Sequence, residues 1–234
     1  MDFPLSQSGL LSLLTHLHEV AEDRQTALRG RLQHFQRLRF PPGVNTGRGK
    51  PAAYGAGSIL SLSVAFEMLQ LGMLPEAIVR LLTRYSGVLP AAAKYTGHLL
   101  LGDQTEVGTP DYYVITFDPA ALSNLQGDSF GDNDRHFYMS LASLKGHFAR
   151  EIHEEFWQTR LSIVNTTTLI FRISDYLYEH HRVSATDFSN ALIWWAKKQE
   201  EIEILRISGA ELQEDSGQIF LTGTPIENDD DLDP

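Results

Sequence analysis

Apolar side chains recur at helical spacing in the first third of the chain. From Leu28 to Leu38 they occupy every third or fourth position, which places them on one face of a helix predicted over residues 27–38. Pro41 and Pro42 follow, and they end the helix because proline lacks an amide donor and restricts the residue before it. Polar and basic residues occupy the other faces, so this helix is predicted to lie at the surface of a core.

Further helices are predicted on both sides of it. A leucine-rich lead-in helix falls within residues 1–14, and a short helix from Leu17 to Asp23 precedes a turn at residues 24–26. After a glycine-rich loop or hairpin over residues 43–54, an apolar helix spans 58–71 and ends at Gly72. Pro75 opens the next helix, which continues to about Tyr85.

The pattern changes near Ser86, Gly87 and Pro90, where we predict a boundary. Strand-like segments follow at residues 98–101 and 112–117, and a long helix is predicted over 136–159. Residues 161–164 are read either as a strand or as a continuation of that helix. The remaining predictions are a helix over 168–181, a helix to Glu201 that begins with a Ser184–Asp187 capping box, and a hairpin of 202–207 with 218–222.

These elements predict a mainly α fold with an α+β C-terminal part. A helical domain would occupy residues 15–85, an α/β dimerisation or sensor domain would occupy 90–225, and an acidic, disordered tail would cover 226–234.

Composition narrows the class of protein. The 234 residues carry a formal net charge of −11 and include no cysteine, which excludes disulfides and thiolate metal sites. The apolar runs are too short to span a bilayer, and the N-terminus lacks the features of a signal peptide. A cytoplasmic location is therefore expected.

Positive charge is concentrated in one window of this acidic chain. Residues 24–50 contain seven Arg or Lys and no Asp or Glu. A cationic segment of this kind favours phosphate binding, and the acidic remainder would be repelled by a polyanion. We therefore expect any contact with nucleic acid to involve the first third of the chain.

The series of motifs from Leu17 to Leu82 resembles the DNA-binding domain of MerR-type transcription regulators. The segments that carry the resemblance are Leu17–Glu22, Thr26–Phe35, Leu38–Pro42, Gly49–Tyr54 and Leu69–Ile78. The resemblance implies a winged helix-turn-helix that binds double-stranded DNA, in a regulator associated with the nucleoid. A homodimer would read a palindromic operator, and RNA polymerase is a potential further partner.

Roles for individual residues follow from the helix and the wing. Arg29 and Arg31 lie near the start of the recognition helix and are expected to read bases, whereas arginines near its ends are expected to grip phosphates. The full set of expected DNA-binding residues is Arg24, Thr26, Arg29, Arg31, Gln33, His34, Arg37, Arg39, Asn45, Thr46, Arg48, Lys50 and Tyr54.

Other functions are less favoured. A metal site at His147, Glu151 and His153 is not expected, because His153 lies about 120° from the face that the other two share. No cofactor motif or nucleophile–base set is recognisable, so an enzyme is not predicted. An architectural or recombination accessory protein and a protein-interaction adaptor remain alternatives, and the sequence leaves the operator, the effector and the sign of regulation open.

Overall fold

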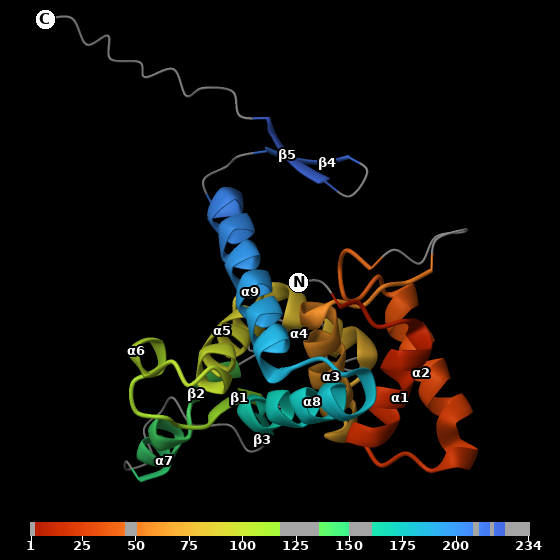
Figure 1. Ribbon diagram of the computed structural model, residues 1–234, viewed down its shortest axis with the longest axis horizontal. Helices are drawn as coiled ribbons and strands as arrows, with labels where there is room; N and C mark the ends of the chain where they lie inside the picture. The colour runs from red at the N-terminus through yellow and green to blue at the C-terminus, as the bar shows by residue number, and fades with distance from the viewer. Residues whose placement is uncertain are drawn as a thin grey trace, which may run out of the picture.

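The computed structural model describes residues 3–44, 51–117, 136–149, 161–207, 211–215 and 218–222. These residues form a mainly helical body with a three-stranded antiparallel sheet at one side and a two-stranded hairpin beyond the last helix (Figure 1). The prediction of a mainly α fold is therefore confirmed. The predicted tail at 226–234 lies outside the described residues.

The first helical segments differ from their prediction. Helix α1 (Gln7–Leu17) covers the lead-in region and continues past it, whereas the helix predicted from Leu17 to Asp23 is wrong. Glu19 has a positive φ of 49°, which ends α1, and a single 3-10 turn, η1 (Glu22–Arg24), leads into α2 (Gln25–Arg37). The helix predicted over 27–38 is thus confirmed as α2.

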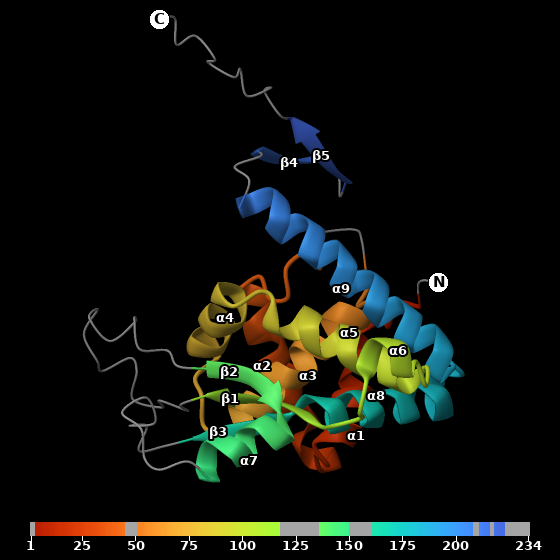
Figure 2. The same ribbon diagram turned by 90° about the vertical axis from the view of Figure 1, so that its left-hand side faces the viewer.

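Helix α3 (Ala56–Gln70) lies at the centre of the body. Apolar or small side chains surround it on every side, and eleven of its fifteen residues are buried. It contacts α1, α4, α5, α8 and α9, as the two ribbon views also show (Figures 1 and 2). Helix α4 (Pro75–Arg84) follows after Gly72, as predicted, and buries Ile78, Leu81 and Leu82.

The boundary region continues in helical form. Helix α5 (Val88–Leu100) includes most of residues 98–101, so the strand predicted there is wrong. The short helix α6 (Gln104–Val107) leads towards β1 (Tyr113–Phe117), which confirms the strand predicted over 112–117. β1 is the central strand, with β2 (His136–Ser140) on one side and β3 (Ser162–Asn165) on the other.

The long helix predicted from residue 136 is wrong at its start. Residues 136–140 pair with β1 as β2, and helix α7 (Leu141–Ala149) begins only afterwards. Residues 150–160 lie outside the described part of the chain. β3 resolves the alternative at 161–164 in favour of a strand.

Two well-capped helices follow the sheet. Helix α8 (Thr166–His181) begins at Asn165, whose side chain accepts a hydrogen bond from the Thr168 amide. Helix α9 (Ala185–Ile207) begins with the predicted capping box, in which Ser184 Oγ accepts from the Asp187 amide at 3.0 Å. It continues past Glu201 through residues 202–207, so the hairpin is formed instead by β4 (Glu211–Asp215) and β5 (Gln218–Thr222).

One continuous hydrophobic core joins the two halves of the chain. It includes Leu10 and Leu32 from the first third together with Ile170 and Phe188 from the last. Two polar contacts also link α1 to α8: Arg172 donates to the Leu17 carbonyl at 2.8 Å, and Tyr176 donates to Ser12 Oγ at 2.8 Å. The division predicted near residues 85–90 is not marked by a break in this core.

Candidate nucleic-acid interface

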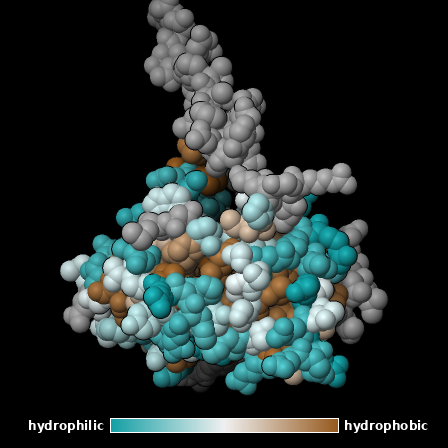
Figure 3. All heavy atoms as spheres, turned by 45° about the vertical axis from the view of Figure 1, so that its right-hand side comes forward, coloured by the Kyte–Doolittle hydropathy of each residue, from teal (hydrophilic) through white to brown (hydrophobic). Residues whose placement is uncertain are grey.

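Helix α2 packs against the body with one face and exposes the other. Leu28, Leu32 and Phe35 are buried at 4%, 0% and 0% relative exposure, as the apolar spacing predicts. The polar candidates on the remaining surface are exposed, and Figure 3 shows hydrophilic side chains over much of this side of the molecule. The exposed candidates of α2 and its two ends are Arg24, Thr26, Arg29, Arg31, Gln33, Arg37 and Arg39.

The C-terminal end of α2 is closed by hydrogen bonds rather than by the prolines alone. Arg39 has φ of +57°, and its amide donates to the Gln36 carbonyl at 3.0 Å. The Phe40 amide donates to the Phe35 carbonyl at 3.0 Å, and the rings of Phe35 and Phe40 pack with centroids 5.9 Å apart. These contacts constitute a Schellman motif, which places Arg39 in the left-handed region that glycine usually occupies.

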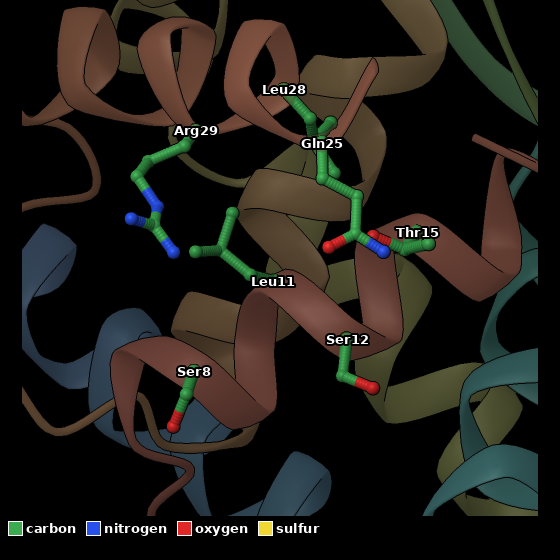
Figure 4. A pocket seen from close by; sticks show the side chains of 7 residues that line it. All are labelled: Ser8, Leu11, Ser12, Thr15, Gln25, Leu28 and Arg29. Atoms are coloured by element: carbon green, nitrogen blue, oxygen red, sulfur yellow. The ribbon is translucent and has the colours of Figure 1, made fainter. Parts of the chain in front are cut away.

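The structure separates Arg29 from Arg31. Two positions along an α-helix differ by about 200° around its axis, so these side chains leave α2 on opposite flanks. Arg29 lies over a groove between α1 and α2, together with Gln25 from the same helix (Figure 4). Arg31 lies on the flank that carries His34, towards α4. One shared role for both arginines therefore does not follow from their nearness in sequence.

The groove beside Arg29 is small and polar. It has a volume of about 230 Å³, and α1 supplies Ser8, Leu11, Ser12 and Thr15 to its wall. Two of these hydroxyls already have partners, because Ser12 Oγ accepts from Tyr176 and Ser8 Oγ lies 2.8 Å from Ser6 Oγ. In Figure 4 the Gln25 amide points towards Thr15, and the Arg29 guanidinium lies beside Leu11.

His34 has an acidic partner. Its Nε2 lies 2.8 Å from Oε1 of Glu76, in the first turn of α4. A backbone hydrogen bond at the start of α4, followed by the hydrogen bond with His34, lowers the pKa of the exposed Glu76 carboxyl. The ionised carboxylate therefore places a negative charge at the edge of the candidate surface, on the His34 flank.

The remaining candidates fall into three groups. Arg24 is exposed but lies 3.2 Å from the Asp23 carboxylate, which offsets part of its charge. Asn45, Thr46, Arg48 and Lys50, in the predicted wing, lie outside the described residues. Tyr54 is fully buried.

The burial of Tyr54 is a correction to its expected contact with DNA. Its hydroxyl accepts a hydrogen bond from Gln36 Nε2 at 2.6 Å, and burial raises its pKa. Its backbone pairs with Leu5 through two hydrogen bonds of 2.9 and 3.0 Å. In this arrangement Tyr54 fixes the end of the loop against the body, and its side chain has no access to a ligand.

A buried polar cluster where α1, α3 and α8 meet was not predicted. His18 has a side chain only 4% exposed, stacks on Phe66 and lies 3.7 Å from Glu67, and its Nδ1 is within hydrogen-bonding distance of Gln70. Burial, followed by the nearby charge of Arg172, lowers the pKa of His18 to about 4. Its Nε2 is buried without a hydrogen-bond partner among the described residues. His18 follows an apolar helical run, and that position carries no signal of burial.

The described part of the chain also bears on metal binding and on membrane insertion. Within the described ranges, no three His, Asp or Glu side chains are grouped so that they could hold a metal ion. No helix within those ranges is both long enough and apolar enough to cross a membrane. Glu151 and His153 of the disfavoured metal reading lie outside them.

Comparison with known proteins gives no relative for this chain. No protein-family model, curated protein or solved structure matches it significantly.

Proposed function

We propose that this protein binds double-stranded DNA through the exposed face of α2 and acts as a transcription regulator. One observation carries the proposal: the surface of α2 is exposed and arginine-rich, within a 27-residue window that lacks any acidic residue in a chain of net charge −11. Such a surface attracts the phosphate backbone and loses affinity as salt rises.

Helix geometry suggests how the residues divide their roles. Thr26 and Arg37 lie along the strip opposite the buried face, within about 30° of its centre, and Gln33 lies about 50° from it. Gln33 is on the side of Arg29, with which it lines a groove against α1. A helix in the major groove directs such a strip at the base edges, where glutamine pairs with adenine and arginine with guanine. Arg29 and Arg31 lie on the two flanks, where phosphates of the opposing strands would run. This assignment differs from the sequence-based expectation, which gives the base contacts to Arg29 and Arg31.

Gly30 belongs to the same outward strip. A Cβ built there meets no atom within 4 Å, so the fold does not require glycine at this position. The missing side chain would instead leave room for close approach of a ligand to the helix backbone.

The first test is selection of bound duplexes from a random DNA pool at two salt concentrations. We expect a palindromic sequence to be enriched and its binding to weaken as salt rises. Binding without enrichment would favour an architectural protein. Absence of binding at low salt would overturn the proposal and favour a protein-interaction adaptor.

Single substitutions then test the assignment. Gln33→Ala is expected to relax specificity at one position of the site, with a loss of about 1–3 kcal/mol for the preferred sequence. Arg31→Gln is expected to weaken all duplexes similarly and to reduce the salt slope by about one. Lys197→Gln removes an exposed charge from α9 and serves as the matched control. An equal loss in the control would contradict the role of α2.

A further inference from the structure

Negative charge is concentrated at the opposite end of the chain from the basic helix. Residues 208–234 contain eight of the thirty acidic residues and none of the nineteen basic ones. Five of the eight belong to the acidic tail, residues 226–234, at Glu227, Asp229, Asp230, Asp231 and Asp233. No lysine, arginine or histidine within this segment can neutralise them locally.

The exposed face of α2 has the complementary charge. Within the described chain, no ion pair or hydrogen bond is found for the side chains of Arg29, Arg31 or Arg37. Two basic groups elsewhere are engaged: Lys94 lies 3.1 Å from Glu200, and Arg172 donates to the Leu17 carbonyl. Helix α2 therefore presents three cations that no described acidic side chain neutralises.

We propose that the acidic tail docks on the exposed face of α2 and competes there with nucleic acid. The inference rests on the proposed function for its regulatory meaning, whereas the docking itself depends only on charge. Consecutive aspartates on an extended chain carry one charge per about 3.3–3.6 Å, a linear charge density close to that of one DNA strand, which carries one phosphate per about 3.4 Å of helix axis. A helix face that accepts a row of phosphates accepts a row of carboxylates by the same interaction.

The length of chain is sufficient for the contact. Of the 27 residues that follow Ile207, the last residue of α9, twelve belong to the hairpin at 211–222. The other fifteen can span about 50 Å when extended. A compact chain of this size has a diameter of about 45 Å. The tail is therefore long enough to lie across the body, and the tether raises its local concentration to about the millimolar range.

Docking can be measured in the full-length chain without any DNA. Because the protein contains no cysteine, Leu232→Cys provides a unique position for a spin label in the acidic tail. We expect the label to broaden the amide resonances of α2 at low salt, and to spare those of α6, at another side of the body (Figure 1). The broadening should disappear at high salt and in a variant that carries Arg29→Gln, Arg31→Gln and Arg37→Gln. Absence of broadening, or broadening that survives these three substitutions, would overturn the proposal.

Competition is tested by neutralising the tail. In the full-length chain, Asp229→Asn, Asp230→Asn and Asp231→Asn together are expected to tighten duplex binding about tenfold at low salt, with the difference lost at high salt. Neutralising three exposed acids of the body, with Glu106→Gln, Asp175→Asn and Glu179→Gln, is the charge-matched control and should change affinity less than twofold. An equal gain in both variants would show general repulsion rather than docking and would overturn the proposal. Tail-dependent broadening without any duplex binding would support docking and overturn the proposed function. Duplex binding without broadening would support the proposed function and overturn docking.

Discussion

Helices α2 and α3 are similar in length and follow each other in the chain, yet they differ in almost every physical respect. Helix α2 buries one stripe and exposes a polar, arginine-rich surface, whereas α3 is buried on all sides. Each helix contains one glycine, and the surroundings of the two glycines also differ. Gly30 of α2 has open space around it, whereas Gly57 of α3 lies against the indole of Trp195.

The comparison distinguishes side chains that stabilise the fold from exposed side chains that are available for binding. Replacement of a buried side chain on α3 acts on packing, because this helix contacts five other helices. Replacement on the exposed face of α2 leaves the core unchanged, so its effect must arise from ligands, charge or helix propensity. The same kind of substitution therefore reports on stability in one helix and on binding in the other.

The largest expected effect is that of Gly57→Ala. A Cβ at this position would lie 2.2 Å from the indole of Trp195, a rigid group held between α3 and α9. We expect a loss of about 3 kcal/mol in the free energy of unfolding, because an overpacked core must displace its neighbours. Urea denaturation of the variant measures this loss. A change below about 0.5 kcal/mol would show that α9 can move away from α3 at little cost.

The next effect concerns pH at the junction of α1 with α3. The pKa of His18 is lowered from 6.5 to about 4 in the folded chain, so the unfolded chain binds a proton first as pH falls. Stability is therefore complete above pH 6.5 and decreases between 6.5 and 4, with a loss of about 2 kcal/mol between pH 7 and pH 5. Burial raises the pKa of Glu67, which acts in the opposite direction because protonation of that carboxyl favours the folded state.

Denaturation at pH 7 and pH 5 measures this dependence. His18→Gln should remove most of the difference between the two pH values, while His180→Gln, at an exposed position of α8, should leave it intact. If His18→Gln retained the full difference in stability between pH 7 and pH 5, the acid sensitivity would have to arise from other groups than the buried His18.

These helices also show how far the sequence can predict the fold. Apolar spacing with a glycine or proline at the ends identified α2, α3 and α4. It failed where the stop signal was a non-glycine residue in the left-handed region, since Glu19 ends α1 and removes the helix expected after Leu17. It also failed near residue 98, where a run of leucines suggested a strand. These residues instead belong to α5, which buries a face that includes Ala92, Ala93 and Gly97.

The candidate site was predictable in composition but not in geometry. The exposure of the arginines followed from the buried stripe of Leu28, Leu32 and Phe35. The burial of Tyr54 and His18 did not, because their partners come from distant parts of the chain: Leu5 pairs with Tyr54, and Arg172 lies near His18. Local periodicity contains no information on such contacts.

The smallest expected effect is a gain in stability from Gly30→Ala. A Cβ there meets no atom within 4 Å, and alanine favours an exposed helix interior over glycine by about 1 kcal/mol. Thermal unfolding should therefore shift upwards in Gly30→Ala, opposite in sign to Gly57→Ala. Measured together with DNA binding, the variant also tests the outward strip: a more stable protein that binds less tightly would place a ligand against Gly30. Loss of stability would instead contradict the open space around it.

The Schellman motif at Arg39 has a consequence for how the gene can vary. Glycine codons lie a single base change from those of arginine and of glutamate, so Arg39→Gly and Glu19→Gly both arise readily by spontaneous mutation. Each would relieve the cost of a left-handed backbone at a non-glycine residue. Glu19→Gly removes an acid that lies before the basic window, whereas Arg39→Gly removes a cation from within it. In the living cell, the fitness of Arg39→Gly relative to Glu19→Gly would show whether loss of a surface cation outweighs the gain in folding stability.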